Sequence, residues 1–468
     1  MSHRFWSAVL FAVVLSPALS AQILGGIVGE VHDATGAVVV GATVTVINTD
    51  TNATRSTVSN EAGLYSFPGL VPGPYTVRLQ MTGFRPAARS LELEVQQTAR
   101  IDFSLELGQV NEAVEVTAEG AQLNTENATV GTVIEQRRIL DLPLNGRNFL
   151  QLVGLSPNVA TGFTSQGSAS ARQGGDRANQ NMAIAGQRSE WNYFTLDGVN
   201  NTDPNFNSYL VLPSVDMLLE FKVQSGIYPA EFGHEASQIN VSTRSGTNAF
   251  HGTLYEFVRN DKFDAKQAYS FSASDHTLPK TPFQWNQYGF MLGGPVMIPK
   301  IFSGRDKLFF ATNYEGFRQV ARPTNVYSVA SVAMRGGDFS ALNTSIWDPR
   351  NRKLAGDGKT VIATPFANNI IPPNLISPQA AKLYEFEPLP NSPSESTPNA
   401  VPLRNFRETL HSFSNKDQFH QRIDWIESAK SSWFGRFSWT DEALFNPGPT
   451  TVTYYLNGSQ TVVNAKQK

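Results

Sequence analysis

Few residues in this chain could do chemistry, and none stands at a spacing that a known reaction needs. His234-Glu235-Ala236-Ser237-Gln238 begins like the helical zinc motif of metalloproteases, in which two imidazoles one helical turn apart hold the metal. The second histidine is replaced by Gln238, so this interpretation fails. The 7 histidines are scattered and the chain has no cysteine. It also lacks a Gly-x-Ser-x-Gly nucleophile turn and a Gly-Lys-Ser/Thr phosphate loop. We therefore expect no enzyme, no catalytic residue, no cofactor and no metal site.

The bulk composition favours a protein built of strands and turns. Lys and Arg number 37 and Asp and Glu number 40, so no basic excess points to nucleic acid. Charged residues make up only 16% of the 468 residues, against about 25% in an ordinary soluble domain. The 36 glycines and 27 prolines suit strands joined by many turns.

The N-terminus resembles an export signal. His3 and Arg4 form a short basic start, Ala8 to Leu15 is apolar, and small residues follow up to Ala21. We predict a signal peptide over residues 1–21. Its apolar run is too short to span a bilayer, and no later segment approaches about 18 uninterrupted apolar residues. An exported chain without cysteine must be stabilised by cores or by sheet closure rather than by disulfides.

Residues 25–107 have the pattern of a small β-sandwich. Apolar residues alternate along short segments, and turn signals such as Asn60-Glu61-Ala62-Gly63 separate them, which predicts about seven strands. Gly63-x-Tyr65-x-Phe67 and Leu70-x-Pro72-Gly73-x-Tyr75-x-Val77 resemble the carboxypeptidase regulatory-like domain, a transthyretin-type sandwich with a carbohydrate-binding-like fold. That module is not catalytic in its family. A structural or docking role is favoured over sugar binding.

A short extended linker follows at residues 109–118. Alternating Val114 and Val116 would let it add as a strand to the exposed sheet edge of a partner. The linker resembles the TonB box of TonB-dependent receptors. The resemblance implies contact with TonB, the energy-transducing protein of the inner membrane, through Glu112, Ala113, Val114, Glu115, Val116 and Thr117.

Residues 119–246 resemble the plug domain of such receptors. "LPLNGRNFLQLVGLSPNV", from Leu142 to Val159, resembles its helical entry and the turn after it. Asp197-Gly198 is a hairpin signal between apolar strands. A functional role for Arg188 or Asp197 is weighed against a purely structural one, and the structural role is favoured. Ser237-Gln238 stand where glycines are common in the family, which leaves the local packing open. The motif residues carried over from the plug are Arg147, Gly186, Arg188, Asp197 and Gly198.

From residue 249 to residue 468 the pattern changes to aromatic-rich alternating segments. Trp433, Phe437 and Trp439 share one face of a strand, opposite Arg436 and Ser438. One apolar and one polar face over about ten residues is typical of membrane β-barrels, although a soluble sandwich gives the same alternation. "RSGTNAFHGTLYEFVRND", "NQYGFMLGGPV" and "KLFFATNYEGFR" resemble the opening barrel strands of Oar-like TonB-dependent receptors. The Pro- and Asn-rich stretch from Thr364 to Pro402 suits a long external loop.

The length of this segment predicts an incomplete barrel. Barrels of that family have about 22 strands of about 9–11 residues each, whereas we expect only about four to eight strands in residues 249–468. The end "VNAKQK" lacks the usual terminal aromatic residue. The chain therefore resembles the N-terminal part of a receptor. The expected fold is mainly β: an N-terminal transthyretin-like sandwich, a small α+β plug domain and the first strands of an incomplete antiparallel transmembrane barrel.

Two classes of function stay open. The first is an outer-membrane TonB-dependent receptor that takes up a nutrient, such as an oligosaccharide, a peptide or a siderophore, with TonB and outer-membrane lipid as partners and the sandwich in the periplasm. The second is a secreted or surface-attached β-rich carbohydrate-binding or adhesion protein. Outward-pointing aromatic side chains clustered at two levels favour the first, while burial of both sheet faces favours the second. A signalling or adhesion role for the receptor architecture is a third hypothesis.

Overall fold

The computed structural model describes most of the chain as strands joined by turns. The residues described are 24–108, 114–117, 126, 129–161, 182–188, 191–204, 208–228, 237–265, 281–393 and 401–445, with the backbone alone at 114–117. The predicted signal peptide lies outside this set, as do Glu112 and Ala113 of the box-like segment. A search of the described residues finds no helix both long and apolar enough to cross a membrane.

The chain divides into two compact units. The first takes the residues within Met1–Glu256, Gln287–Gly316 and Lys416–Asp441, and the second those within Phe257–Asn286, Phe317–Asn415 and Glu442–Lys468.

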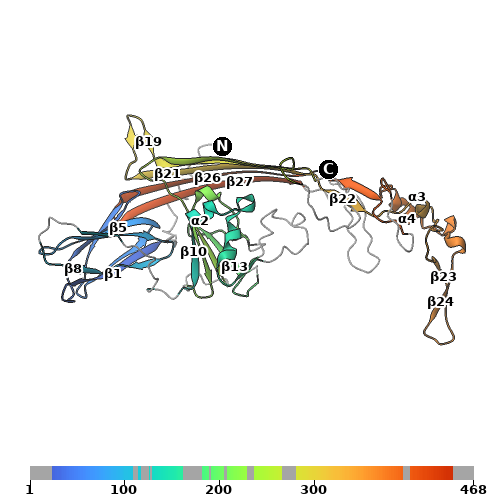
Figure 1. Ribbon diagram of the computed structural model, residues 1–468, viewed down its shortest axis with the longest axis horizontal. Coiled ribbons are helices and arrows are strands. Elements are labelled where there is room, and N and C mark those ends of the chain that lie inside the picture. The colour runs from blue at the N-terminus through green and yellow to red at the C-terminus, as the bar shows by residue number, and fades with distance from the viewer. Residues whose placement is uncertain are drawn as a thin grey trace, which may run out of the picture. The chain divides into compact units, whose positions relative to one another are not determined.

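The N-terminal part of the first unit is a sandwich of two sheets, drawn in blue in Figure 1. One sheet has the order β4-β1-β7, with β8 also paired to β1, and the other has the order β3-β2-β5-β6-β9. Residues 98–105 form two short strands where one was expected, so eight strands precede the linker. The strands are β1 Gly25–Asp33, β2 Thr43–Asn48, β3 Thr54–Val58, β4 Leu64–Leu70, β5 Gly73–Gln80, β6 Ala87–Leu93, β7 Thr98–Arg100, β8 Phe103–Leu105 and β9 Val114–Thr117.

The alternation read from the sequence accounts for the core of this sandwich. Tyr65, Phe67, Tyr75 and Val77, which carry the family resemblance, are all buried in one cluster. Tyr65 donates its hydroxyl hydrogen to the backbone oxygen of Ile101 at 2.5 Å, which satisfies the polar end of a buried ring. The resemblance therefore rests on core positions.

The green strands of Figure 1 belong to a smaller α+β domain, here called the middle domain, which spans the described residues from 129 to 243. Its five-stranded sheet has the order β10-β15-β16-β13-β14. The strands are β10 Gly131–Glu135, β13 Asn192–Leu196, β14 Val199–Asn200, β15 Leu218–Ser225 and β16 Ser237–Thr243, and a separate pair joins β11 Val159–Thr161 to β12 Met182–Ile184.

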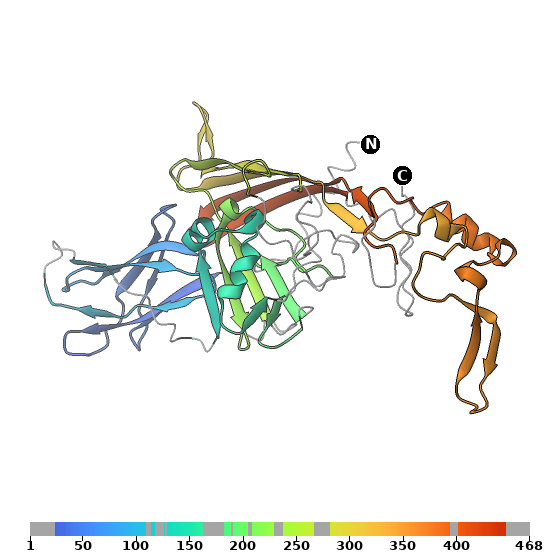
Figure 2. The same cartoon turned by 45° about the vertical axis from the view of Figure 1, so that its right-hand side comes forward.

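Short helices cover the apolar face of the middle-domain sheet. They are α2 Gln136–Asp141, η1 Asn145–Arg147, η2 Phe149–Leu155 and η6 Val215–Met217. Phe149 of η2 packs on Phe221 of β15, with ring centroids 5.3 Å apart, inside one continuous core. Figure 2 shows these helices beside the green strands. The prediction of a helical entry between Leu142 and Val159 is confirmed, as 3-10 turns.

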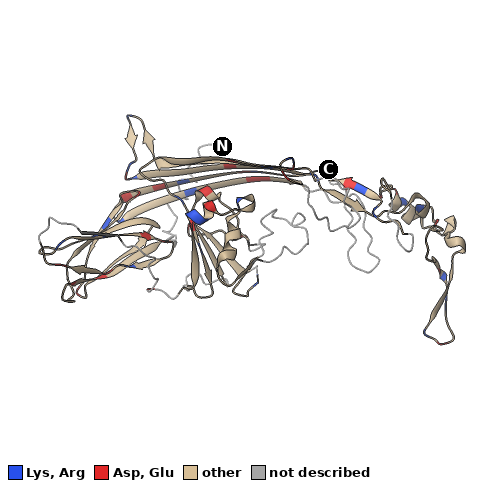
Figure 3. Cartoon of the chain, in the orientation of Figure 1, with Lys and Arg blue, Asp and Glu red and all other residues tan. Residues whose placement is uncertain are grey.

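Five long strands form the third sheet, in the order β17-β18-β21-β26-β27. They are β17 His251–Asn260, β18 Phe283–Pro295, β21 Leu308–Ala321, β26 Ser412–Ser428 and β27 Ser431–Phe445. The two residues between β26 and β27 make a tight hairpin, which requires antiparallel pairing. Charged positions are sparse along these strands (Figure 3). A small pair, β19 Met297–Ile298 and β20 Phe302–Ser303, lies between β18 and β21 in sequence.

The second unit also holds shorter elements between β21 and β26. The described residues between Thr364 and Pro402, a stretch expected to be a loop, include three short helices, so they are more ordered than their composition suggested. These elements are β22 Thr324–Tyr327, α3 Val332–Arg335, β23 Trp347–Leu354, β24 Val361–Pro365, η8 Ala367–Asn369, η9 Pro373–Leu375, α4 Pro378–Tyr384 and β25 Phe406–Thr409.

Candidate functional site

The turn between β13 and β14 places a buried carboxylate against the long strands. Asp197 and Gly198 both have positive φ, +50° and +78°, which is the backbone of the tight hairpin predicted from this dipeptide. The Asp197 carboxylate is only 3% exposed and accepts hydrogen bonds from the backbone nitrogen and the hydroxyl of Thr243, at 2.8 and 2.7 Å. The turn therefore fixes the carboxylate as well as the hairpin.

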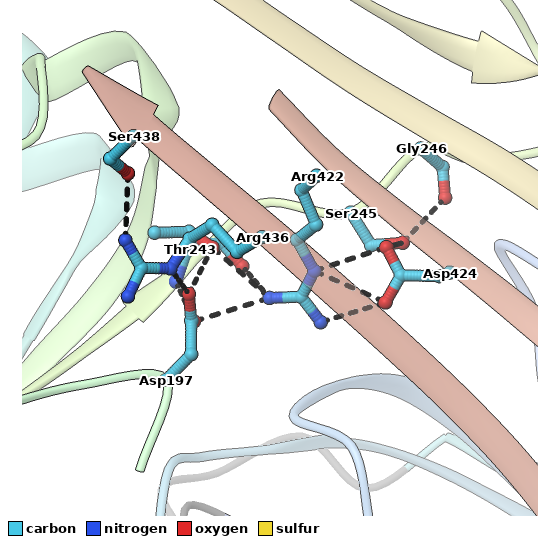
Figure 4. Close-up of polar contacts among 8 residues, drawn as sticks. All are labelled: Asp197, Thr243, Ser245, Gly246, Arg422, Asp424, Arg436 and Ser438. Carbon is cyan, nitrogen blue, oxygen red and sulfur yellow. Dashed lines mark hydrogen bonds and ion pairs between the residues drawn. The ribbon is translucent and has the colours of Figure 1, made fainter. Parts of the chain in front are cut away.

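Two arginines of the long strands complete this cluster, which Figure 4 shows in close-up. Arg422 of β26 lies 3.2 Å from Asp197 Oδ1, and Arg436 of β27 lies 2.9 Å from its Oδ2. Arg422 also pairs with Asp424 at 2.8 Å, and Asp424 accepts a hydrogen bond from Ser245 at 2.9 Å. Two cations and two carboxylates thus compensate one another in a buried setting. We call this set the Asp197 cluster.

A second buried cluster forms around Arg147, at the Asn-Gly turn of the opening helical segment. Arg147 contacts the carboxylate of Asp216 on η6 and lies 3.5 Å from Glu315 of β21. Its guanidinium also stacks over the ring of Tyr255 on β17, 4.3 Å from the centroid. Glu315 accepts hydrogen bonds from the Tyr255 hydroxyl at 2.8 Å and from Ser214 at 3.2 Å. We call this set the Arg147 cluster.

The structure brings together only part of the motif set predicted from the sequence. Arg147 and Asp197 each anchor a cluster, and Gly198 shapes the turn that carries Asp197. Gly186, with φ of +72°, lies with Arg188 in an exposed turn after β12, and neither takes part in the two clusters. The Asp197 carboxylate also pairs with two arginines that are distant in sequence, and these contacts are compatible with the structural role favoured from the sequence.

A third contact joins the middle domain to the sandwich, and the sequence reading missed it. Glu220 of β15 accepts a hydrogen bond from the backbone nitrogen of Val95 at 2.5 Å. Lys222 donates to the backbone oxygen of Gln96 at 3.3 Å, and Asn240 donates to the side-chain oxygen of Gln96 at 3.1 Å. The alternation of Glu220 and Lys222 along β15 resembles a solvated face, but the turn after β6 covers it.

Burial shifts the pKa values of the two charged residues in this contact, Glu220 and Lys222. Removal from water raises the pKa of Glu220 to about 8, the Val95 hydrogen bond opposes the rise, and the nearby carboxylates of Glu94 and Glu92 add to it. Burial also lowers the pKa of Lys222 from its ordinary value, against the attraction of Glu94 and Glu220. Glu220 is therefore largely protonated at neutral pH, in which state its carbonyl oxygen still accepts from Val95.

The long strands bury many polar side chains on one face, beside apolar ones such as Phe309 and Met291, and expose large apolar side chains on the other face. Asn313 and His420 are 0% and 1% exposed, whereas Trp433 and Phe437 are each 61% exposed. This arrangement is the reverse of a soluble sandwich, in which both sheet faces would be buried or the outer one would be polar. The alternation predicted from the sequence is confirmed, and its direction matches a sheet that faces lipid.

The zinc-like motif is not a helix where the structure describes it. Ser237 and Gln238 begin β16, and Ser237 donates to the side-chain oxygen of Asn192 at 2.6 Å in a buried contact. Packing at this pair, left open by the sequence, is therefore tight and polar. Within the described ranges no group of three or more His, Cys, Asp or Glu side chains could hold a metal ion.

Comparisons with known proteins agree with this architecture. Residues 242–468 match the family described as outer membrane beta barrel domain, and residues 26–106 match the carboxypeptidase regulatory-like domain. The chain is 26% identical over 282 residues to the TonB-dependent transporter Oar of Myxococcus xanthus, a match that takes 58% of this chain and 24% of the relative. The chain thus spans about a quarter of the length of that curated relative.

Two solved structures are also similar. A mutant of the ferric enterobactin receptor PfeA of Pseudomonas aeruginosa, in complex with enterobactin, aligns with a TM-score of 0.35 and 13% identity over 68% of this chain and 34% of that chain. The outer membrane transporter YddB of Escherichia coli aligns with a TM-score of 0.35 and 13% identity over 64% of this chain and 31% of that chain.

The chain therefore matches a carboxypeptidase regulatory-like domain in its N-terminal part and an outer membrane beta barrel domain from residue 242 on, and these matches support an outer-membrane location. More particularly, it is similar to an Oar-like TonB-dependent transporter, and that curated relative is a transporter rather than an enzyme. The resemblance seen in the sequence motifs is confirmed.

Proposed function

We propose that the protein is an outer-membrane transporter that takes up a nutrient with energy transmitted by TonB, and that the middle domain is its plug. The observation that carries the proposal is the pair of buried ion-pair clusters. Asp197 and Arg147 join the middle domain to the polar face of the long strands through charges. Desolvated ion pairs hold a domain in one position, and entering water can compensate both charges when the domain moves.

The remaining assignments follow the same proposal. The segment from Glu112 to Thr117 would pair with TonB as an added strand, after export directed by residues 1–21. The sandwich would lie in the periplasm, and the exposed aromatic residues of the long strands would contact outer-membrane lipid. The imported nutrient stays open among oligosaccharides, peptides and siderophores, because a carbohydrate-binding-like fold does not fix a ligand.

The alternative of a secreted binding protein fits the observations less well. A secreted protein would bury both faces of the long strands or carry a polar face toward water. The apolar face instead exposes Trp425, Trp433 and Trp439, by 46%, 61% and 47%. A large exposed apolar patch is usually an interaction surface, and aromatic residues on the outer face of a β-sheet are typical of contact with lipid.

The test is a proline in the box-like segment. Val114→Pro removes a backbone donor from a short strand, so we expect binding of the purified periplasmic domain of TonB to weaken at least tenfold, a loss equal to about 1.4 kcal/mol. The matched control is Ala34→Pro, at the second position of an exposed turn that a hydrogen bond from Gly36 to Asp33 closes at 3.0 Å and where proline is favoured. Undiminished binding to the Val114→Pro protein in outer membranes would refute the assignment.

A further inference from the structure

The described part of the box-like segment is already a strand of this protein. β9 lies parallel to β6, with Ala87, Ala88, Arg89 and Ser90 opposite Val114, Glu115, Val116 and Thr117. It is the outermost strand of its sheet, in the order β3-β2-β5-β6-β9. The sequence predicted that this segment would add to the sheet of a partner, whereas the structure pairs it with the sheet of its own sandwich.

We propose that β6 is a docking strand that holds this segment extended, and that the incoming strand of the partner pairs with the outer edge of β9 while β9 stays in place. The inference rests on the proposed function, because it names how that partner is received. Alternate residues of a strand direct their backbone groups to opposite edges. Pairing with β6 uses one edge of β9, and in the described sheet the other edge is open. The backbone N–H and C=O groups on one edge of β9 therefore bond to β6, and those on the other edge stay available to a partner strand.

Pre-ordering is the physical benefit of this arrangement. A free linker must lose backbone conformational freedom before it can form a ladder with a partner. A linker already extended on β6 has lost that freedom beforehand, so more of the pairing energy is retained as affinity. The sandwich thus presents the segment instead of merely preceding it in sequence.

The same strand reaches the middle domain at its other end. β6 ends at Leu93, and the turn that follows donates the Val95 backbone hydrogen to Glu220 and accepts from Lys222 and Asn240 at Gln96. A load applied to β9 therefore reaches β15 and β16 through β6, in addition to the covalent path along the chain. This gives the sandwich a part in transmission as well as in docking.

A cysteine pair tests the docking directly, because the chain has no cysteine of its own. Ala88→Cys with Glu115→Cys places thiols on register partners of neighbouring strands, at the roughly 5 Å spacing that a disulfide spans. The control pair is Thr57→Cys with Glu115→Cys, since Thr57 lies on β3 at the far edge of the same sheet. Oxidation of the full-length protein in outer membranes should cross-link the first pair at least tenfold faster than the control. Equal rates, or no cross-link in either pair, would overturn the docking.

The locked protein then tests how the partner is received. We expect the oxidised Ala88→Cys/Glu115→Cys protein to bind the purified periplasmic domain of TonB within about threefold of the reduced form, because the outer edge of β9 is unchanged. A tenfold loss on oxidation, restored by reductant, would overturn the inference and show that the segment must leave β6. If the reduced protein and the unmodified protein both fail to bind the TonB domain, the proposed function fails, while the cross-linking rates still decide whether β9 docks on β6.

Discussion

Glu220→Gln tests whether the contact between the middle domain and the sandwich depends on the ionisation of Glu220, because it removes the titratable group and keeps the shape of the side chain. The carboxyl group of Glu220 is 7% exposed and accepts from Val95, and glutamine retains an oxygen at the same position without a titratable proton. The groups that face it are Glu92 on β6, Glu94 just after β6 and Lys222 on its own strand. The substitution should therefore keep the hydrogen bond and remove its dependence on pH.

The magnitude follows from the pKa of Glu220, which rises from an ordinary 4.5 to about 8. Below about pH 4.5 the group is protonated in both the docked and the unfolded state, and the contact has its full stability. As the pH rises from 4.5 to 8 the unfolded state ionises first, so stability falls and the loss is complete above about pH 8. At about 1.4 kcal/mol per pH unit the loss reaches at most about 5 kcal/mol.

Hydrogen–deuterium exchange of the Val95 amide measures this loss, because that amide donates to Glu220. After correction for the intrinsic rate at each pH, protection should fall steadily between about pH 5 and pH 8 in the wild-type protein. It should stay level in Glu220→Gln. Glu106→Gln, at a side chain that is 72% exposed, is the matched control and should behave as the wild type does. Level protection in the wild-type protein across this range would refute the reasoning.

Three further predictions concern the other contacts. Asp197→Asn keeps the hairpin turn but leaves buried Arg436 without its carboxylate and Arg422 with Asp424 alone, so the middle domain should be destabilised by about 3 kcal/mol, measured as faster proteolysis of that domain in purified protein. Gly29→Ala should prevent folding of the sandwich, because a Cβ there would lie 1.8 Å from a backbone oxygen, while Gly26→Ala, with its nearest atom at 3.5 Å, should change the melting temperature little. Phe437→Lys puts a charge on the exposed apolar face, where about 2–4 kcal/mol of destabilisation should lower the yield in outer membranes, and an unchanged yield would argue against lipid contact.

The sequence predicted the parts of the fold that local pattern determines. The period-two alternation of β5 and the turn residues around Gly63 predicted the sandwich, and both lie where the pattern requires. Asp197-Gly198 predicted a hairpin because its backbone angles are a property of the dipeptide itself. The alternation also predicted that Leu107 lies on the same strand face as Phe103 and Leu105, and this prediction is wrong. The strand ends at Leu105, and Leu107 is 78% exposed.

The candidate site could be predicted only in part, because its partners are distant in sequence. Alternation along β26 assigned Arg422 to the polar face correctly. It gave no reason to pair that side chain with Asp197, which lies 225 residues earlier. Alternation shows that one face of a strand is polar but not what lies against it. Here the middle domain lies against the polar face of β26 and β27. Glu220 is a second case, because the pattern along β15 does not show that a turn of the sandwich covers this side chain.

The polar contacts of the middle domain have one common consequence for mechanism. The middle domain contacts the long strands through the Asp197 and Arg147 clusters and contacts the sandwich through Glu220, Lys222 and Asn240. All three contacts are polar, so the apolar core of the middle domain stays intact when any of them opens. An opening at Glu220 costs hydrogen bonds that water can replace, whereas an opening at Asp197 first requires water to reach two buried arginines. The sandwich contact should therefore yield before the clusters do, and exchange at Val95 should respond to a load on β9 before the turn at Asp197 loses protection.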